Sequence, residues 1–495
     1  MVEWLSPIID ALSQGWYLLR QFWLPLYILM EVVAIFLAIE SIFKSRTSQG
    51  AIAWALGLVF LPPIVVPIYL LFGQRKFYGY VEARRKGDLE IQRIAKQLLE
   101  EMSEQFSLEE DSTYRNSQGA QLLENLALMP YTRGNRVELL VNGNEIFDSI
   151  FSAIDGAENY ILLQFYIVRD DQLGKKLQKK LIEKARQGIK VYFLYDAIGS
   201  FSLSHNYLKG LRQAGVIIEP FRTWRWGKRR RFQINFRNHR KIVVVDGLTA
   251  FVGGANIGDE YLSRDRKLTP WRDTHLQLQG PSVQGAQLSF LEDWYWVAGE
   301  VPDLNWHPQG VNNDQRVLVL PSGPADKLET CQLMFLHAIN SASERLWIVS
   351  PYFVPDDAIL KALKLAALRG VDVRLMLPGI TDNRMVQLSS YAVLLDLRGT
   401  GIRAYQYQNG FLHQKVVLVD SDRAYIGTAN FDNRSFHLNF EVTVMVRGQQ
   451  FALEVESMLN EDFEHCHRLT GEELAQRSVI FKSLVKLSQL FSPIQ

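Results

Sequence analysis

Two stretches of the 495-residue sequence carry histidine and lysine in the same spacing, followed by an aspartate and a small-residue turn. The shared pattern is H-x-K-x4-D-x6-G-[GT]-x-N, beginning at His239 and at His413. Because side chains two residues apart on an extended strand point to the same face, each imidazole and its lysine ammonium would enter one cavity. Lysine offers positive charge to an anionic phosphorus centre, and histidine can act there as nucleophile or proton donor.

The two copies are expected to form one site. Displacement at phosphorus needs a nucleophile on one side and an acid on the other, so two facing copies meet the need without a metal or a cofactor. A lone histidine before a strand is more often a surface or core residue, but two matched copies 174 residues apart favour catalysis. The candidate catalytic residues are His239, Lys241, Asp246, His413, Lys415 and Asp420. For the two aspartates a structural or orienting role is favoured, because aspartate at a strand end commonly forms a turn.

The elements around the two copies repeat in the same order. Apolar strands alternate with helical stretches in each half, which indicates βαβ units and a mainly parallel sheet covered on both faces. The first copy reads ILLQFYIV, IKVYFLYDAI, GVIIEPF and HRKIVVVDG; the second reads RLWIVSPYFV, VDVRLMLPGI, GIRAYQY and HQKVVLVDS. The fold class is therefore α/β, a duplicated sandwich of two pseudo-twofold halves, whose equivalent edges can form one site between them.

Composition limits the classes of function. With 54 Lys+Arg against 53 Asp+Glu, the net charge is +1, so the chain has no global basic excess of the kind nucleic-acid binders show. The two cysteines, Cys331 and Cys466, are too few for a disulfide framework or a cysteine zinc site. The stretch His465–His467 lacks a fourth ligand, and adjacent side chains diverge, so no metal is expected there.

The N-terminal region is apolar enough to enter a membrane. We expect two transmembrane helices, at about 22–43 and 50–72, after a segment at 4–19 that lies along the interface. Glu31 falls in the first helix, where a protonated or paired carboxyl facing the second helix is favoured over a transport role. Prolines should kink the second helix. The excess of Lys and Arg on the outer flanks predicts that both termini are cytoplasmic, with no cleaved signal peptide.

These features predict a division of the chain into six parts. They are a membrane anchor at 1–87, a helical connector at 88–134, a first half at 135–300, a linker at 301–325, a second half at 326–480 and a C-terminal tail at 481–495.

The doubled motif, HRKIVVVD and HQKVVLVD, resembles the phospholipase D superfamily over residues 135–470. Together with the apolar N-terminus, the stretches NFRNHRK, FVGGANIGDEY, WRDTHL, SPYFVPD and GFLHQKVVLVD resemble bacterial cardiolipin synthases. The resemblance implies a ping-pong phosphatidyl transfer in a bacterial inner membrane, in which His239 forms a phosphohistidine. His413 would protonate the departing glycerol and then deprotonate the second lipid hydroxyl.

The resemblance also implies roles for further residues. Both lysines, Asn256 and Asn430 would hold the phosphate oxygens, and so would the hydroxyl of Thr428, whose counterpart in the first copy is Gly254. A carboxylate downstream of each histidine would orient it, and Asp273 and Glu441 are the candidates.

Three questions stay open at this stage. The basic run at 224–241 could attract anionic lipid headgroups, bind nucleic acid or be a solvated loop, and the first is favoured beside a membrane anchor. The lipid partner is expected to be phosphatidylglycerol, with phosphatidylethanolamine or another alcohol as the alternative second substrate. Hydrolysis by a phospholipase or nuclease is the alternative reaction, and a scaffold without catalysis is disfavoured because both histidines are present.

Overall fold

The computed structural model describes residues 6–45, 47–73, 77, 80, 89–107, 118–222, 235–470, 473, 476 and 478–495. Residues 1–77 with 223–235 form one compact unit, and residues 78–222 with 236–495 form a second one.

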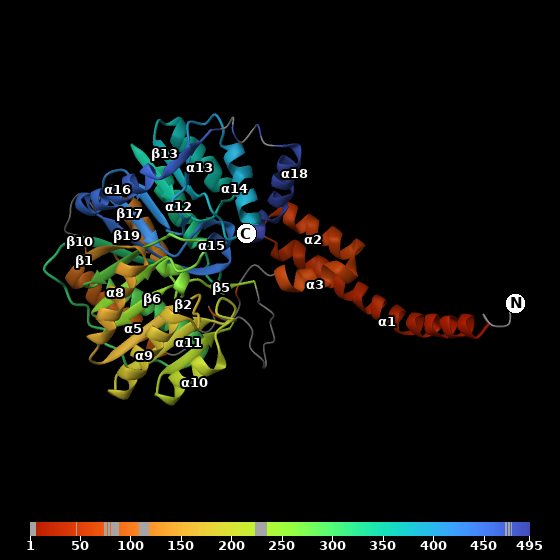
Figure 1. Ribbon diagram of the computed structural model, residues 1–495, viewed down its shortest axis with the longest axis horizontal. Coiled ribbons are helices and arrows are strands. Elements are labelled where there is room, and N and C mark those ends of the chain that lie inside the picture. The colour runs from red at the N-terminus through yellow and green to blue at the C-terminus, as the bar shows by residue number, and fades with distance from the viewer. Residues whose placement is uncertain are drawn as a thin grey trace. The chain divides into compact units, whose positions relative to one another are not determined.

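The N-terminal unit contains three apolar helices, α1 (Ser6–Lys44), α2 (Ser48–Phe60) and α3 (Pro62–Phe72), drawn in red in Figure 1. Within α1, the 22 residues Trp23–Lys44 are long and apolar enough to cross a membrane. They span about 33 Å at 1.5 Å per residue, close to the thickness of a hydrocarbon core. Helix α1 begins at Ser6. The described residues of the interfacial segment expected at 4–19 therefore form the start of this helix.

The second expected span, residues 50–72, is not a single helix. Helix α2 ends at Phe60 and α3 begins at Pro62, where a helix can start because proline lacks the N–H that an interior turn would need. The expected kink is thus a complete break. At about 20 Å and 17 Å, neither piece alone reaches across a hydrocarbon core of about 30 Å.

Helix α3 folds back along α2. The rings of Trp54 and Tyr69 lie 5.2 Å apart, although a continuous helix would separate them by about 22 Å. A β-carbon on Gly57 would lie 3.3 Å from the side chain of Val65, so the helices approach closely there. The prediction of a second membrane-length helix is therefore corrected to a short helical hairpin that packs on α1.

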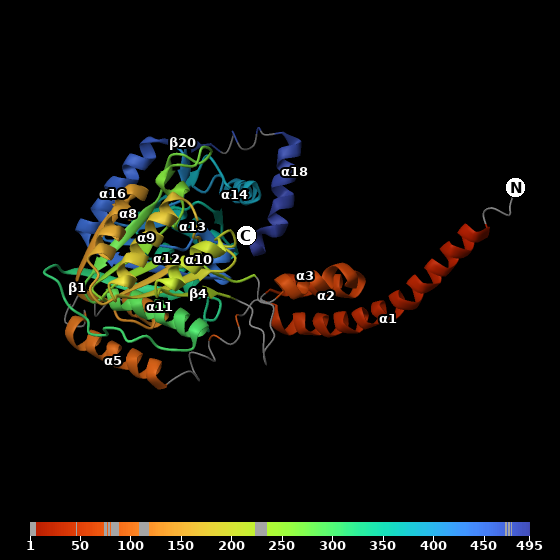
Figure 2. The same ribbon diagram turned by 60° about the horizontal axis from the view of Figure 1, so that its bottom comes forward.

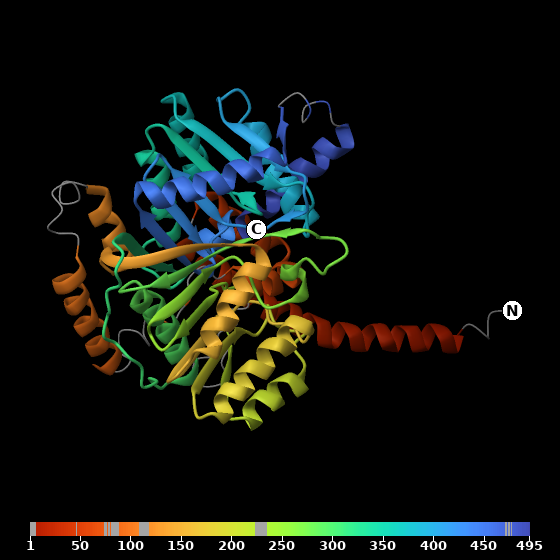
Figure 3. The same cartoon turned by 60° about the vertical axis from the view of Figure 1, so that its left-hand side comes forward.

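A continuous 16-stranded sheet runs through the second unit, in which Figure 3 shows the two halves side by side. The elements of the first half are β1 (Thr132–Val141), α8 (Asn142–Asp155), β2 (Tyr160–Phe165), α9 (Gln172–Arg186), β3 (Lys190–Asp196), α10 (His205–Gln213), β4 (Ile217–Phe221), β5 (Arg237–Asn238), β6 (Ile242–Val245), β7 (Thr249–Gly253), η1 (Asp259–Leu262), β8 (Trp271–Arg272), β9 (Thr274–Gln279) and α11 (Val283–Ala298).

The second half repeats this order. Its elements are β10 (Gln315–Ser322), α12 (Thr330–Ser341), β11 (Arg345–Val349), β12 (Phe353–Val354), α13 (Asp357–Leu368), β13 (Asp372–Pro378), α14 (Arg384–Asp396), β14 (Arg403–Tyr407), β15 (Phe411–Leu412), β16 (Val416–Val419), β17 (Arg423–Gly427), β18 (Phe431–Asp432), α15 (Asn433–His437), β19 (Asn439–Arg447), α16 (Gln449–Glu464) and β20 (Cys466–Leu469).

The sheet is mixed rather than mainly parallel. Strands β2, β3 and β4 are parallel, as are β11, β13 and β14, because helices connect them. The strands that follow the histidines, β6 and β16, form tight hairpins with β7 and β17 and are therefore antiparallel. Helices α8, α9 and α10 contribute to one core on one face of the first half, and α11 packs elsewhere on the sheet, as Figure 2 shows.

Two expected boundaries are corrected. The linker expected at 301–325 contains β10, which pairs with β1 and with β19 at the centre of the sheet. The connector expected at 88–134 contains the helices α5 (Leu89–Phe106) and α7 (Gln118–Ala127) and the start of β1. Leu98, Met102 and Leu123 are buried in the core of the second half, so these helices belong to the folded domain.

The C-terminal segment is also ordered. Helix α18 (Val479–Ser488) and the 3-10 helix η2 (Gln489–Ile494) occupy the region expected to be a tail. Helix α18 packs against α14, where Tyr391 and Phe481 meet edge to face with ring centroids 5.6 Å apart.

Candidate active site

Short strands exchanged between the halves position both histidines. Strand β5 of the first half pairs in parallel with the start of β19, and β15 of the second half pairs in parallel with β8. The backbone N–H of His239 donates to Phe440 O at 2.9 Å, and that of His413 donates to Arg272 O at 2.8 Å. These pairings bring each histidine to the other half, so one site forms between the two halves.

Each imidazole is hydrogen-bonded to a carboxylate of the opposite half. His239 Nδ1 lies 2.9 Å from Glu441 Oε2, and His413 Nδ1 lies 2.7 Å from Asp273 Oδ2. The sequence suggested both carboxylates, but as partners of the histidine upstream in the same half; the structure exchanges them. With the Nδ1 proton donated to a carboxylate, Nε2 is the unprotonated nitrogen of each ring, and that of His413 lies 3.2 Å from Lys415 Nζ.

Neighbouring side chains fix Glu441, which is fully buried. Its Oε2 accepts a hydrogen bond from Thr428 Oγ1 at 2.6 Å, and its Oε1 accepts bonds from Ser435 Oγ at 2.8 Å and Asn439 Nδ2 at 3.1 Å. The expected phosphate contact of Thr428 is therefore corrected, because its hydroxyl proton is donated to Glu441 and the residue is fully buried.

Asp273 is held differently because its side chain is shorter. Its Oδ1 accepts from the backbone N–H of Thr274 at 2.9 Å, and its Oδ2 accepts from the indole of Trp271 at 3.3 Å. A β-carbon on Gly254 would lie only 2.0 Å from Asp273 Oδ1. Glycine at 254 therefore leaves the space for this carboxylate, just as threonine at 428 suits the longer Glu441.

Both lysines are buried beside the histidines. Lys241 Nζ donates to His239 O at 2.7 Å, and Lys415 Nζ lies 3.0 Å from His413 Nδ1 and also donates to His413 O. Two buried ammonium groups within one site make it suited to an anion.

Burial determines the charge of the site. It lowers the pKa of His239 to about 4 and that of His413 to about 3, although each carboxylate partner opposes the change. The pKa of Asp273 falls to about 2, and that of Glu441 is also lowered, because the histidines and lysines stabilise the anions against their burial. At neutral pH the site therefore holds neutral imidazoles and anionic carboxylates.

The two asparagines differ. Asn256 Oδ1 accepts from the backbone N–H of Ile167 at 3.0 Å, and its Nδ2 donates to the hydroxyl of Tyr261 at 2.7 Å. Asn430 is buried, but its side-chain oxygen has no hydrogen-bond partner among the described residues. The atom without a partner is an acceptor, which cannot bind a phosphate oxygen, so the contact of either asparagine with phosphate stays a prediction.

Asp246 and Asp420 do not join the site, so they are removed from the candidate catalytic residues, and their contacts agree with the structural role that was favoured for them. Each stands with positive φ at the end of the strand that leads away from its histidine. Asp246 accepts backbone N–H bonds of 2.7–2.8 Å from Glu158, Asn159 and Tyr160. Asp420 accepts equivalent bonds from residues 343–345. Both hold the turn that precedes the first parallel strand of their half.

Sequence reasoning missed the aromatic walls and two buried ion pairs. The rings of Trp271 and Tyr261 lie 5.0 and 5.9 Å from that of His413, and Tyr166 lies 5.0 Å from His239. The middle residue of the first H-x-K, Arg240, pairs with Asp293 at 2.9 Å.

The second buried pair links the halves directly. Arg272, in the quoted WRDTHL stretch, pairs with Asp462 at 2.7 Å. Both arginines lie inside buried motifs. A charged residue in such a position is the sequence signal that could have predicted each ion pair.

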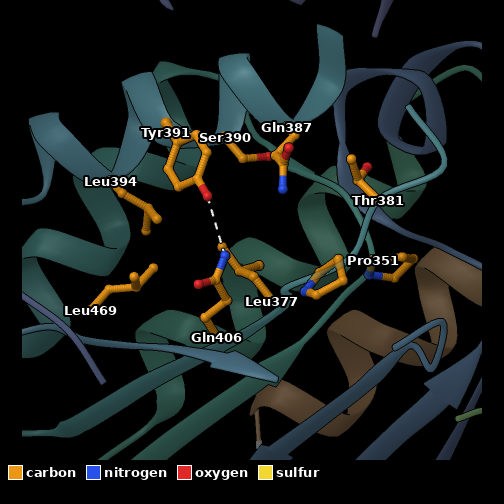
Figure 4. A pocket seen from close by; sticks show the side chains of 10 residues that line it. Pro351, Leu377, Thr381, Gln387, Ser390, Tyr391, Leu394, Gln406 and Leu469 are labelled. Carbon is orange, nitrogen blue, oxygen red and sulfur yellow. Dashed lines mark hydrogen bonds between the residues drawn. The ribbon is translucent and has the colours of Figure 1, made fainter. Parts of the chain in front are cut away.

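A separate pocket lies beneath α14 in the second half, with about 370 Å³ of space including its opening to solvent. Figure 4 shows Tyr391 and Gln406 hydrogen-bonded across it, with Leu377 and Pro351 below. Most of the basic run at 224–241 lies outside the described residues. Within the described part of the chain, no cluster of three or more His, Cys, Asp or Glu is placed to hold a metal ion.

Comparison with known proteins identifies the family. Residues 150–271 and 335–463 match the family model described as cardiolipin synthase, PLD-like domain, and residues 32–74 match phospholipase D-nuclease N-terminal. Cardiolipin synthase A of Pseudomonas putida is 46% identical over 94% of this chain and 97% of its own, and that of Pseudomonas aeruginosa is 47% identical over 94% of each.

A solved structure supports the fold. The crystal structure of phosphatidylserine synthase of Haemophilus influenzae aligns with 76% of this chain and all of its own, with a TM-score of 0.57 and 16% identity. With the family model covering both halves and close relatives covering nearly the whole chain, this protein belongs to the cardiolipin synthases of the phospholipase D superfamily.

Proposed function

We propose that this protein is a phosphatidyltransferase that converts two molecules of phosphatidylglycerol into cardiolipin and glycerol. The observation that carries the proposal is the pair of exchanged histidine–carboxylate contacts in a chain 46–47% identical to cardiolipin synthases. Two histidines, one on each side of phosphorus, can act on one lipid phosphate as nucleophile and as acid.

In the first step, His239 Nε2 attacks the phosphorus of phosphatidylglycerol and forms a phosphorus–nitrogen bond. The bond from phosphorus to the glycerol oxygen breaks, and His413 gives its proton to that oxygen. In the second step, a headgroup hydroxyl of another phosphatidylglycerol attacks phosphorus, returns a proton to His413 and releases His239. The bound phosphodiester anion raises the pKa of the imidazoles and so makes a protonated His413 accessible.

In both steps the charged side chains of the site act on the phosphate. The ammonium groups of Lys241 and Lys415 stabilise the charge on the phosphate oxygens. The aromatic walls limit water around the phosphohistidine, which favours a lipid hydroxyl over hydrolysis.

The N-terminal unit supports a location at a membrane, and we propose that Trp23–Lys44 is its one crossing. The folded-back α2–α3 pair would enter the bilayer without crossing it. Basic residues then favour a cytoplasmic catalytic domain, since Lys44 ends the span, Arg46 and the five basic residues of 75–86 follow it, and only Arg20 precedes it. Single-cysteine labelling from each side of sealed vesicles would test this topology; labelling of both chain termini from one side would contradict it.

The activity is tested with purified full-length protein in mixed micelles that contain labelled phosphatidylglycerol and a chelator. Cardiolipin and free glycerol are expected in equal amounts. Accumulation of phosphatidic acid would instead identify a phospholipase. Adding phosphatidylethanolamine and finding ethanolamine release would extend the second substrate to that lipid.

A further inference from the structure

Helix α18 exposes an apolar surface that the fold leaves uncovered. Ile480, Leu484 and Leu487 are 74%, 47% and 56% exposed and follow a spacing of four and three residues, so they lie on one side of the helix. Leu490 and Phe491 of η2 extend this surface at 73% and 47% exposure. Exposed apolar side chains gathered in this way mark an interaction surface.

A second side of α18, about 100° around the helix from this surface, is already occupied. Val485 and Ser488 are buried, Phe481 packs on Tyr391, and Ser389 Oγ donates to Ser488 O at 3.1 Å. The exposed apolar stripe is therefore not the face by which the helix folds onto α14.

The charges of this segment indicate its partner. From Ser478 to Gln495 the only charged side chains are Lys482 and Lys486, both exposed, one turn apart. The lysines follow Ile480 by two and six residues, so they lie on the polar side of the helix, away from the exposed leucines. An amphipathic helix with this division is suited to the interface of a bilayer that carries anionic lipid. A protein partner of opposite charge is less favoured, since two lysines offer little specific recognition beside so large an apolar area.

We propose that α18 and η2 form a second membrane contact, by which the second half of the catalytic domain lies on the surface of an anionic bilayer. The proposal is independent of phosphatidyl transfer, because it concerns how the domain meets the membrane and not the reaction. It places α14, and the pocket beneath it, next to lipid.

The experiment uses full-length protein in liposomes, with Cys466→Ser to remove the accessible thiol and leave only the buried Cys331. Leu484→Cys carries an environment-sensitive fluorophore. The matched control is Leu453→Cys on α16, where the leucine is 46% exposed among glutamates, away from α18 in Figures 1 and 2. Lipids with a nitroxide near the carboxyl end of the acyl chain serve as quencher.

In liposomes containing phosphatidylglycerol, we expect quenching at Leu484 to exceed that at Leu453 by about twofold or more. Lys482→Glu with Lys486→Glu should abolish the difference, whereas Lys175→Glu with Lys179→Glu, an exposed pair of the same spacing on α9, should preserve it. Equal quenching at the two positions would overturn the proposal. So would a probe at Leu484 shielded from both nitroxide lipid and water-soluble quencher, which would show that protein covers the stripe. Neither result depends on turnover, so both are distinct from a failure of the proposed function.

Discussion

His239 Nδ1 lies 2.9 Å from Glu441 Oε2, although 202 residues separate them and they belong to different halves of the fold. The equivalent contact between His413 and Asp273 runs in the opposite direction along the chain. Neither half therefore carries a complete histidine–carboxylate pair, and the duplicated domain is catalytically meaningful only as a whole.

Glu441→Gln should reduce kcat strongly while leaving the protein folded. The amide keeps the size of the side chain but no longer favours the Nδ1–H tautomer, so Nε2 of His239 is no longer held as the nucleophile. By analogy with carboxamide replacement in a serine protease triad, we expect a loss of about 10²- to 10⁴-fold. The measurement is the initial rate of cardiolipin formation, together with the yield of labelled phosphoenzyme.

The control is Glu456→Gln, which removes a carboxylate paired with Arg345 in the same half but outside the site. Its rate per folded molecule should stay near that of the wild type. A Glu441→Gln enzyme as active as this control would show that His239 does not depend on Glu441.

Gly254→Ala should impair the second histidine. The added β-carbon would lie 2.0 Å from Asp273 Oδ1, so the carboxylate must move away from His413. We expect kcat to fall about 10-fold or more, as misplaced catalytic geometry does elsewhere. Gly156→Ala is the control, because a β-carbon there meets nothing closer than 3.6 Å and the residue has an ordinary φ of −84°. Equal rates in the two variants would show that Asp273 tolerates displacement.

The sequence was sufficient to predict the duplicated halves and the residues that meet in the site. A motif repeated at constant spacing predicts the same strand and turn in each copy. The structure brings both histidines, both lysines and both carboxylates together. The partner of each histidine could not be read from the sequence. It depends on β5 pairing with β19 and on β8 pairing with β15. Strands β5, β8 and β15 have two residues each, which is too short to show a periodicity in the sequence.

Other errors have local causes. The charge-free stretch 50–72 is apolar and long enough to be predicted as a membrane-spanning helix. Hydropathy does not detect the chain reversal that begins at Pro62. Strand β10 was assigned to a linker because it follows residues 299–314, a stretch without a helix or a strand. Asp246 shares a motif with His239, yet the intervening strand β6 carries it to the far end of the hairpin, about 13 Å along the chain direction.

Asp246→Asn should therefore reduce stability and not catalysis. The carboxylate accepts three backbone N–H bonds, and an amide oxygen can keep only part of them, so we expect the free energy of unfolding to fall by about 1–3 kcal/mol. Thermal unfolding measures this change, and the rate per folded molecule should be nearly unchanged. If a fully folded variant instead turned over about 100-fold more slowly, as expected for loss of a catalytic acid or base, Asp246 would return to the catalytic residues.

The charge state of the two imidazoles can be followed directly by NMR titration of the protein without lipid. Burial lowers the pKa of His239 to about 4 and that of His413 to about 3, so each ring gains a proton only as the pH falls through those values. Both imidazoles should thus stay neutral through pH 6, where an ordinary histidine would already be mostly protonated. A titration midpoint near pH 6.5 at either ring would contradict the desolvated imidazoles, because that ring would then titrate as it does in water. On the alkaline side, burial lowers the pKa of Lys415 to about 8, so kcat/KM should fall as the pH rises through about 8 and positive charge beside the phosphate is lost.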